Sequence, residues 1–233
     1  MEKIGIVGGR FLIKTKIWKK SKKNTLRIPY GILRFSKFKN SFLIPRHGLK
    51  GEIPPQKINY KANIFALKKL GVKYVFAFNS VGSLKLRIKP GHFLTPDDYI
   101  DFNPPTFFEI KAQYITPKLS EKVRKIFIKI LSQLNVKFWK KGVYFNTKGP
   151  RLETKAEIKM MKNFADVVGM TMAKEATLSQ ELGLEYASLC AVDNFAHGIT
   201  KKPLSKENIF KNQEKSAKIF EKVIEKIINE NFN

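Results

Sequence analysis

Short apolar runs that alternate with amphipathic helical patterns constrain the fold of this chain more than any other feature. The runs KIGIV (3–7) and KYVFAF (73–78) are almost continuously apolar, which is typical of strands that are buried on both faces. Further strands are predicted at 142–146, 166–169 and 184–192. Strands that alternate with helices in this way predict an α/β protein with a central sheet.

Helical patterns occupy most of the sequence between these strands. INYKANIFALKKLG (58–71) places its apolar residues on one face and stops at Gly71. Other helices are predicted at 118–134, 154–164, 173–182 and about 205–230. The segment 11–46 predicts a meander of strands, whereas 79–83 predicts a turn and the proline-rich segment 103–117 a functional or interface loop.

Length and cysteine content favour one cytoplasmic domain spanning 1–233. A chain of 233 residues can bury most of its surface around one core. Cys190 is the only cysteine, which excludes an intrachain disulfide and a cysteine-based zinc site. No apolar run approaches the ~18 residues that cross a bilayer, and we expect no membrane association.

The formal charge of +26 raises nucleic-acid binding as a rival function. Only seven of the 45 basic residues are arginines, however, and the lysines are spread along the chain. Guanidinium groups are preferred for bidentate contacts with bases and phosphates. We therefore expect lysine to be mainly a solvated residue here, and specific nucleic-acid binding is not expected. The non-enzymatic alternative is a basic RNA-binding protein that uses the segment 14–40.

Four loops with unusual chemistry each follow an apolar strand, which would gather them at one edge of the sheet. They are Gly8 to Arg10, Arg46 to Gly48, Asn79 to Ser83, and Gly169 to Thr171. Exposed backbone N–H groups, a planar guanidinium, an imidazole and short hydroxyls are the donors that an oxyanion needs. Taken singly, such loops are more often ordinary strand ends than ligand sites.

Two further segments carry candidate functional residues. In GPRLETKAE (149–157), Glu153 precedes a predicted helix, and the alternative is that Glu153 and Thr154 only begin that helix. In CAVDNFAHGI (190–199), a strand is predicted to end at Asp193 and Asn194. The Asn194 amide can pair with a ring edge that carries a carbonyl and a neighbouring N–H, whereas an ionised Asp193 can only accept.

The ordered set of motifs IGIVGG, PRHG, PPQKINYKANIFALKKLG, NSVGSL, PGHFLTPDDYIDF, KGPRLETKAE, DVVGMT and VDNFAHG resembles the trimeric purine nucleoside phosphorylase and methylthioadenosine phosphorylase family. The resemblance covers nearly the whole chain. It implies an α/β single domain with a central mixed β-sheet partly closed into a barrel and flanked by helices, assembled as a homotrimer or homohexamer. The implied reaction is reversible phosphorolysis of a purine nucleoside. Inorganic phosphate would be the co-substrate, with no metal and no organic cofactor.

The resemblance also implies roles for individual residues. His47, Glu153 and Asn194 would be the catalytic residues. The phosphate would be held by Gly9, Arg10, Arg46, His47, Ser80 and Thr171. The nucleoside would be bound by Ser80, Val81, Gly82, Leu152, Glu153, Gly169, Met170, Asp193 and Asn194. Phe107 or Phe108 of an adjacent subunit would cover the 5′ group.

The choice between subfamilies depends on the loop at Asn194. Methylthioadenosine enzymes typically carry Thr-Asp-Tyr-Asp there, whereas Asn194 followed by Ala196 and Gly198 resembles the 6-oxopurine enzymes. We therefore favour the 6-oxopurine assignment. The alternative is S-methyl-5′-thioadenosine phosphorylase, since a one-residue shift would place Asp193 against the base. The chain departs from the family at Arg10, where a Ser or Thr is usual, and at Leu152, where an aromatic residue is common.

Overall fold

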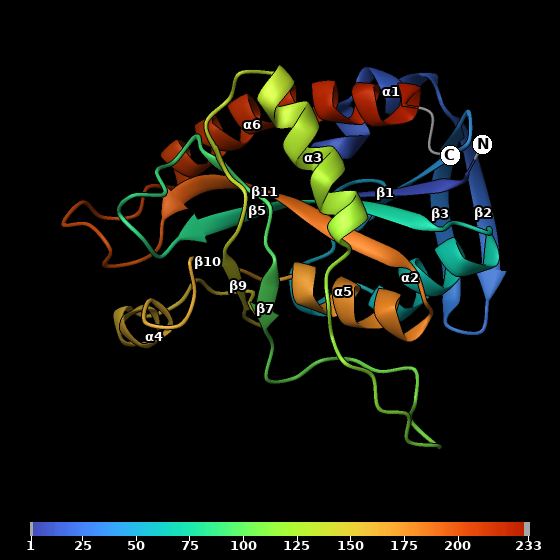
Figure 1. The fold of residues 1–233 in the computed structure, drawn as a ribbon, viewed down its shortest axis with the longest axis horizontal. Coiled ribbons are helices and arrows are strands. Elements are labelled where there is room, and N and C mark those ends of the chain that lie inside the picture. Colours follow the sequence, from blue (N-terminus) through green and yellow to red (C-terminus); the bar gives the residue numbers. More distant parts are fainter. Residues whose placement is uncertain (1, 231–233) are drawn as a thin grey trace.

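The protein consists of one large mixed sheet with helices on both of its faces (Figure 1). The computed structural model describes residues 2–230. Helices α1 (Lys16–Lys20), α3 (Glu121–Gln133) and α6 (Lys206–Asn229) lie on one face, and α2 (Tyr60–Lys69) and α5 (Met172–Glu181) lie on the other. The single-domain α/β arrangement with a central mixed sheet confirms the predicted fold class.

The centre of the sheet consists of four parallel strands. Strand β1 (Ile4–Gly8) pairs with β4 (Ser41–Pro45) and β5 (Tyr74–Ser83), and β5 also pairs with β11 (Glu185–Phe195). Because these pairs are parallel, the carboxyl ends of all four strands meet at one edge. Ligands in open α/β sheets bind at such an edge.

The remaining strands extend and branch this centre. The strand β10 pairs antiparallel with β5, which makes the sheet mixed. The other strands are β2 (Lys22–Ile28), β3 (Gly31–Phe38), β6 (Phe93–Leu94), β7 (Asp98–Ile100), β8 (Phe138–Trp139), β9 (Val143–Asn146) and β10 (Val167–Gly169). Partial closure of the sheet into a barrel stays a prediction.

Helix ends follow local sequence signals. Asn59, Ser120 and Ser205 are N-caps of α2, α3 and α6, and each side chain accepts a hydrogen bond from a backbone N–H in the first turn. Thr154 forms a capping box with Glu157 at the start of α4 (Lys155–Met161). Gly71, with φ +76°, follows the end of α2 as the sequence predicted.

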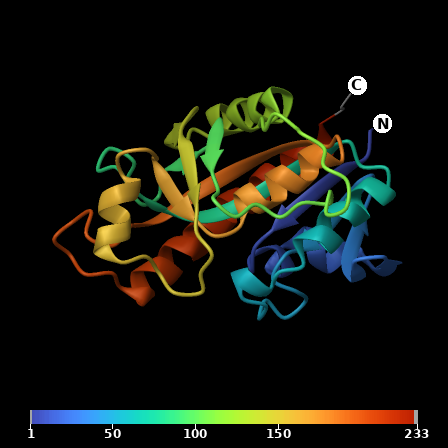
Figure 2. The ribbon, with the colours of Figure 1, turned by 90° about the horizontal axis from the view of Figure 1, so that it is seen from below.

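Two apolar layers fix the sheet edge in place. Between the sheet and α3 and α6, Phe76, Phe78 and Phe127 pack edge to face. On the opposite face, buried residues of α2 and α5 pack against β5 and β11, and Figure 2 shows both helices running beside the long central strands. The strand ends that carry the polar residues therefore project from a rigid core.

The structure corrects three predicted boundaries. Residues 12–14 and 16–20 form a 3-10 turn and helix α1 rather than strands, because Thr15 caps a short helix that buries Ile17 and Trp18. The predicted turn 79–83 belongs to β5, where pairing with β10 and β11 continues to Ser83. The final strand likewise extends past the predicted end, to Phe195.

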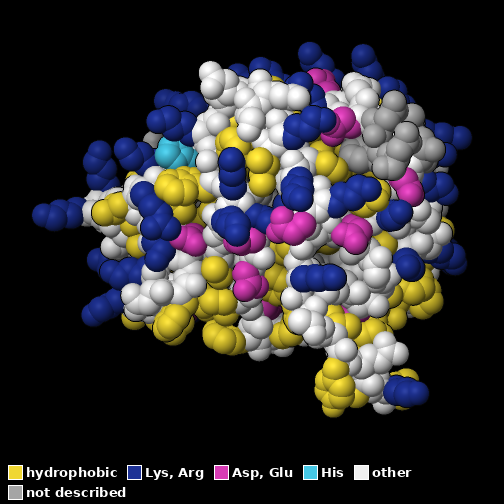
Figure 3. Space-filling view, viewed as in Figure 1, with side chains coloured by type: hydrophobic (Ala, Val, Ile, Leu, Met, Phe, Trp, Pro, Cys, Tyr) yellow, Lys and Arg dark blue, Asp and Glu magenta, His cyan; other side chains and the backbone are white. Residues whose placement is uncertain are grey.

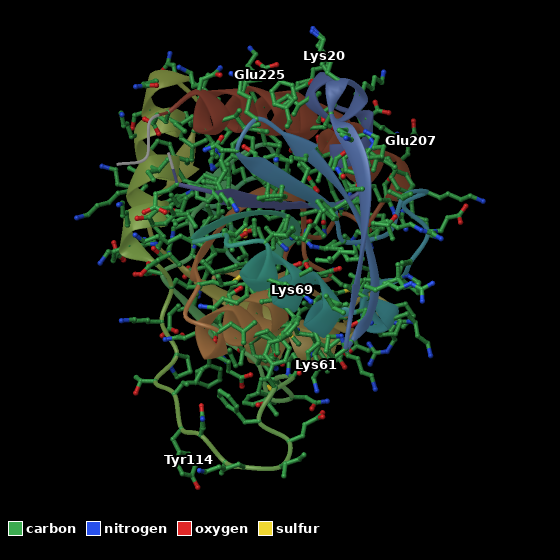
Figure 4. All side chains as sticks on the ribbon, turned by 90° about the vertical axis from the view of Figure 1, so that its right-hand side faces the viewer. Lys20, Lys61, Lys69, Tyr114, Glu207 and Glu225 are labelled. Carbon is green, nitrogen blue, oxygen red and sulfur yellow. The ribbon has the colours of Figure 1, made fainter. Side chains whose placement is uncertain are left out.

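The segment 103–117 contains no helix or strand, as predicted, and forms an arm with Tyr114 near its tip (Figure 4). Phe107 packs within its own chain, with its ring centroid 5.1 Å from that of Tyr30 and 6.2 Å from that of Phe65. Ile110 and Tyr114 are exposed. Among residues 2–230, no helix has the length and apolar character that crossing a membrane requires.

Candidate active site

The carboxyl ends of β1 and β4 form the first half of the candidate site, here called the phosphate end: Gly9, Arg10, Arg46, His47 and Thr171. The Arg46 N–H donates to the Gly8 carbonyl at 3.0 Å, which joins the two strand ends. A Cβ on Gly9 would meet no atom within 4 Å, so space is open beside its backbone. The stem of Arg10 lies against Gly51.

The Arg46 guanidinium is buried and already hydrogen-bonded. Nε and Nη2 donate to the two Glu175 oxygens at 2.6 and 2.9 Å. Nη1 donates to the Phe78 carbonyl at 2.7 Å, and Nη2 also reaches the Val7 carbonyl at 3.4 Å. Of the five N–H groups of a guanidinium, one on Nη1 has no hydrogen-bond partner within residues 2–230. Arg46 thus contributes fixed positive charge and little free hydrogen-bonding capacity.

His47 is held as a neutral ring. Its Nδ1 lies 2.7 Å from the Ile53 carbonyl, which can only accept, so Nδ1 carries the proton. Burial lowers the His47 pKa to about 4, and the nearby charges of Arg46 and Arg10 lower it further, against the hydrogen bond to Ile53. The Nε2 atom is therefore an acceptor at neutral pH, rather than the donor that the sequence predicted.

Thr171 is prepared to donate a hydrogen bond. Ser188 Oγ donates to Asn79 Oδ1 at 2.6 Å, and Asn79 Nδ2 donates to Thr171 Oγ1 at 2.6 Å. This chain fills an acceptor position on the hydroxyl and leaves its hydrogen for another partner. Tyr144 Oη accepts from the backbone N–H of Thr171 at 3.2 Å, which fixes the start of α5.

The second half of the candidate site is here called the base end. It lies at the carboxyl ends of β5, β9, β10 and β11 and in the loop before α4. Its residues are Ser80, Val81, Gly82, Leu152, Glu153, Gly169, Met170, Asp193 and Asn194. The register between β5 and β11 shifts between Val192 and Asn194. Asp193 is the extra residue in this β-bulge, a feature that re-aims side chains. Asp193 and Asn194 consequently face different surroundings.

Asp193 is buried and accepts three hydrogen bonds. Its carboxylate accepts from Ser80 Oγ and, at 3.2 Å, from Ser216 Oγ, and its carbonyl accepts from Asn212 Nδ2 at 2.8 Å. Gln213 Nε2 donates to Ser80 Oγ at 3.1 Å. Burial raises the Asp193 pKa to about 6, which these hydrogen bonds partly oppose. The Ser80 hydroxyl proton is therefore engaged by Asp193, so this hydroxyl is not free to donate to the phosphate that the sequence predicted for Ser80.

Asn194 is half-buried and only locally bonded. Its Nδ2 donates to the adjacent Phe195 carbonyl at 2.9 Å. A Cβ on Gly82 would lie 3.3 Å from Asn194 Nδ2 and 3.5 Å from the Ala196 Cβ. Val81 is buried beside this contact. Gly82 thus leaves the Asn194 amide room, and within residues 2–230 the amide has no buried hydrogen-bond partner that fixes its orientation.

Glu153 faces the protein interior rather than capping α4. It is 8% exposed, and Thr147 Oγ1 donates to its Oε1 at 2.6 Å. Because Thr154 and Glu157 form the capping box, the helix-start explanation applies to Thr154 and leaves Glu153 free for another role. Leu152 is 48% exposed beside it.

Met170 and Gly169 are closely packed at the carboxyl end of β10. Tyr60 Oη donates to the Met170 carbonyl at 3.3 Å. A Cβ on Gly149 would lie 2.6 Å from Met170 Sδ, and one on Gly169 would lie 2.3 Å from Tyr144 Oη. Both glycines are therefore required by close approach.

The structure brings the predicted residues to the strand ends and adds partners that the sequence did not identify. Glu175 contacts Arg46, Tyr144 contacts Thr171, and Thr147 contacts Glu153. These three partners lie in predicted helix, strand or loop positions with no distinguishing local pattern. Asn79 belongs to the segment 79–83, one of the four loops that the sequence predicts at the sheet edge. In the described range 2–230, no group of three or more His, Cys, Asp or Glu side chains could hold a metal ion.

Comparison with known sequences identifies the family of this chain. Residues 23–229 match the family model described as Phosphorylase superfamily. The chain is 38% identical over 231 residues to a probable 6-oxopurine nucleoside phosphorylase of Archaeoglobus fulgidus, covering 97% of this chain and 95% of that protein. It is 42% identical over 237 residues to a probable S-methyl-5′-thioinosine phosphorylase of Methanocaldococcus jannaschii, covering 98% and 93%.

A third relative and a solved structure carry different names. The S-methyl-5′-thioadenosine phosphorylase of Pyrococcus horikoshii is 35% identical, covering 97% of this chain and 93% of that protein. The methylthioadenosine phosphorylase of Schistosoma mansoni in complex with adenine superposes with a TM-score of 0.85 at 25% identity, covering 96% of this chain and 90% of that chain. The relatives therefore agree on the family and differ in the purine that their names specify.

Proposed function

The chain belongs to the Phosphorylase superfamily, and from that premise we propose that it is a purine nucleoside phosphorylase that prefers 6-oxopurine nucleosides. The protein is an enzyme of the pentosyltransferase type. The proposed reaction is reversible phosphorolysis of inosine, guanosine or methylthioinosine, which gives free purine and the sugar 1-phosphate. Inorganic phosphate is the proposed co-substrate, with no metal and no organic cofactor, in a homotrimer or homohexamer.

At the phosphate end, the donors and acceptors suit a phosphate that still carries one proton. The Thr171 hydroxyl and the remaining Nη1 N–H of Arg46 donate to phosphate oxygens. The neutral His47 accepts the phosphate O–H at Nε2. Arg10 supplies a second charge where the family usually has a hydroxyl. Such an arrangement positions the anion for attack on the sugar.

At the sugar, Glu153 is the proposed catalytic carboxylate. Thr147 holds one of its oxygens, which leaves the other to accept from a ribose hydroxyl and to stabilise the positive charge that develops on the sugar. Met170 covers the opposite side, and Leu152 offers an exposed apolar surface. No covalent intermediate with the protein is required.

At the base, Asn194 carries the preference for a 6-oxopurine. Its Oδ1 can accept from the protonated N7 of the departing purine while Nδ2 donates to the 6-carbonyl. A 6-amino group would instead place its own N–H donors against the Nδ2 donor of Asn194. The observation that supports this preference is an amide, rather than a carboxylate, beside Gly82 and Ala196 at the bulge.

S-methyl-5′-thioadenosine phosphorylase is the second candidate, and Asp193 favours it. A carboxyl group whose pKa burial raises to about 6 lies one residue from Asn194. A shift of the bulge by one residue would present this carboxyl to a 6-amino group. The relatives with that name share 34 to 35% identity with the chain.

The test is release of free base from inosine, guanosine, methylthioinosine, adenosine and methylthioadenosine by one preparation, with and without phosphate. We expect phosphate-dependent release that is fastest with a 6-oxopurine nucleoside. Glu153→Gln should lower kcat/KM by about a hundredfold or more, in the range seen when a transition-state hydrogen bond is lost. Thr147→Ala should produce a smaller loss. Absence of base release from all five nucleosides would disprove the function, and preference for the two adenine nucleosides would select the second candidate.

A further inference from the structure

A basic trough on the surface shares no lining residue with either end of the candidate site. It consists of two hollows that share Arg87, with volumes of about 720 and 460 Å³. The larger is lined by Arg87, Lys89, His92, Val136, Lys137, Phe138 and Trp139, and the smaller by Leu84, Lys85, Leu86, Arg87, Lys162, Asn163, Gly198 and Ile199. Figure 3 shows Lys and Arg side chains crowding the edge that carries the loop 84–92. No Asp or Glu lines either hollow.

Trp139 forms a fixed floor for this trough. Its Nε1 donates to His92 Nδ1 at 3.4 Å, and the backbone N–H of Lys89 donates to the same atom at 3.3 Å. Because Nδ1 accepts both bonds, the neutral His92 ring carries its proton on Nε2. The Trp139 ring is therefore restrained by packing and by one long hydrogen bond to His92.

Arg87 lies over that floor in a preorganised position. Its guanidinium carbon is 5.4 Å from the centroid of the Trp139 ring, and Nη2 donates to Asp166 Oδ1 at 3.0 Å. The Arg87 side chain nevertheless remains 61% exposed. The guanidinium thus lies within cation–π distance of Trp139 and is hydrogen-bonded to Asp166, and its remaining N–H groups are free to bind a ligand. Ordering an arginine before binding reduces the entropy lost on binding.

The cations on either side of Arg87 complete the pattern. Lys89 and Lys137 are exposed and line the same hollow, and neither ammonium group forms an ion pair among the described contacts. In the second hollow, Lys85 Nζ donates to the Lys162 carbonyl at 2.6 Å and so stays beside Arg87. A planar surface with positive charges spaced along a trough fits a chain of bases and phosphates, because bases stack on aromatic rings and guanidinium planes.

We propose that this trough binds single-stranded RNA without sequence preference, with a base stacked on Arg87 and phosphates contacted by Arg87, Lys89 and Lys137. Both hollows border Arg87, so together they offer more room than one nucleotide needs, which favours a strand. This inference is independent of the proposed catalytic function, since the trough shares no residue with the phosphate end or the base end. It also places RNA away from the basic segment 14–40.

The chain offers a direct reporter, because it contains two tryptophans, Trp18 and Trp139. In a Trp18→Phe variant of the full chain, Trp139 is the single tryptophan, and a ten-nucleotide oligo(A) RNA should quench its fluorescence. The binding constant should fall with salt with a log–log slope of about −2, from about 0.7 per phosphate contact. Arg87→Ala should weaken binding about tenfold and make the slope less steep by about 0.7.

The matched control is Arg34→Ala, which removes the same charge from an exposed position of β3 in the basic segment. It should change binding less than twofold, and neither substitution should alter nucleoside phosphorolysis. Three results would overturn the proposal: no quenching by RNA, equal weakening by Arg34→Ala and Arg87→Ala, or binding of adenosine monophosphate as tight as that of the oligonucleotide. Full phosphorolysis activity with no RNA binding would refute RNA binding by the trough and leave the proposed catalytic function intact.

Discussion

The phosphate end and the base end differ in how firmly their polar groups are fixed. At the phosphate end, Arg46 is 3% exposed and paired with Glu175, and His47 is a neutral ring bonded to Ile53. At the base end, Asn194 bonds only to its neighbouring carbonyl, and Asp193 has a pKa of about 6. One end has its charges set by burial, whereas the other keeps groups that can reorient or change charge.

This difference separates the type of reaction from the choice of substrate. Under the proposed function, binding a phosphate in a defined place requires donors that do not move, and the buried ion pair and the chain Ser188–Asn79–Thr171 have that fixed character. Choosing among purines requires only that one amide or carboxyl group at the base end changes its orientation toward the base. The relatives, which agree on the family and differ in the named purine, fit such a division.

The largest expected effect comes from breaking the buried pair at the phosphate end. Arg46→Ala leaves the Glu175 charge buried without its partner, which should lower the free energy of unfolding by about 3 to 5 kcal/mol and abolish phosphorolysis. Urea unfolding and base release measure the two effects. Arg34→Ala, an exposed arginine, should change the stability by less than about 0.5 kcal/mol.

A double variant separates folding from phosphate binding. Arg46→Met combined with Glu175→Leu replaces the pair by apolar groups and should recover much of the lost stability. Phosphorolysis should stay absent, because the fixed charge is gone. If the double variant retained a wild-type KM for phosphate, Arg46 would be purely structural, and the contrast between the two ends would fail.

The second effect concerns Asp193 and pH. Burial raises the pKa of this carboxyl from 3.8 to about 6, so the folded state binds its proton more tightly than the unfolded state does. The resulting stabilisation is complete below about pH 4 and is lost as the pH rises through about 6. Relative to Asp193→Asn, the wild-type protein should lose about 2 kcal/mol of stability between pH 4.5 and pH 8.

Urea unfolding at several pH values measures this difference, with Glu214→Gln on the exposed side of α6 as the matched control. The control should follow the wild-type pH dependence. Parallel curves for wild type and Asp193→Asn would show that Asp193 does not titrate differently in the folded state, and the base end would then be as fixed as the phosphate end.

The smallest expected effect is a change of preference at Asn194. Asn194→Asp should shift the ratio of kcat/KM for adenosine to that for inosine about tenfold or more toward adenosine, because a carboxylate accepts from a 6-amino group. Asn103→Asp makes the same change in the exposed loop and should leave the ratio unaltered. A constant ratio in Asn194→Asp would move base recognition to Asp193 or to another loop.

Local patterns predicted most of the helices and strands, and they failed where tertiary pairing decided the outcome. Gly71 after α2 and the buried character of β1 are properties of short segments, so both were predictable. Asn79 to Ser83 have the composition of a turn, yet pairing with β10 and β11 draws them into β5. Helix α1 was missed because its five residues depend on the Thr15 cap and on burial of Trp18.

The sequence by itself determined which kinds of residue follow each strand, and therefore that an arginine, a histidine and short hydroxyls could meet at one edge of a sheet. Only the tertiary structure decided what those residues can do there. Burial and the Ile53 carbonyl make Nε2 of His47 an acceptor rather than a donor. Glu175 accepts hydrogen bonds from Nε and Nη2 of Arg46. A one-residue bulge gives Asp193 and Asn194 different surroundings. Protonation and free hydrogen-bonding capacity depend on neighbours from distant parts of the chain, which no local pattern encodes.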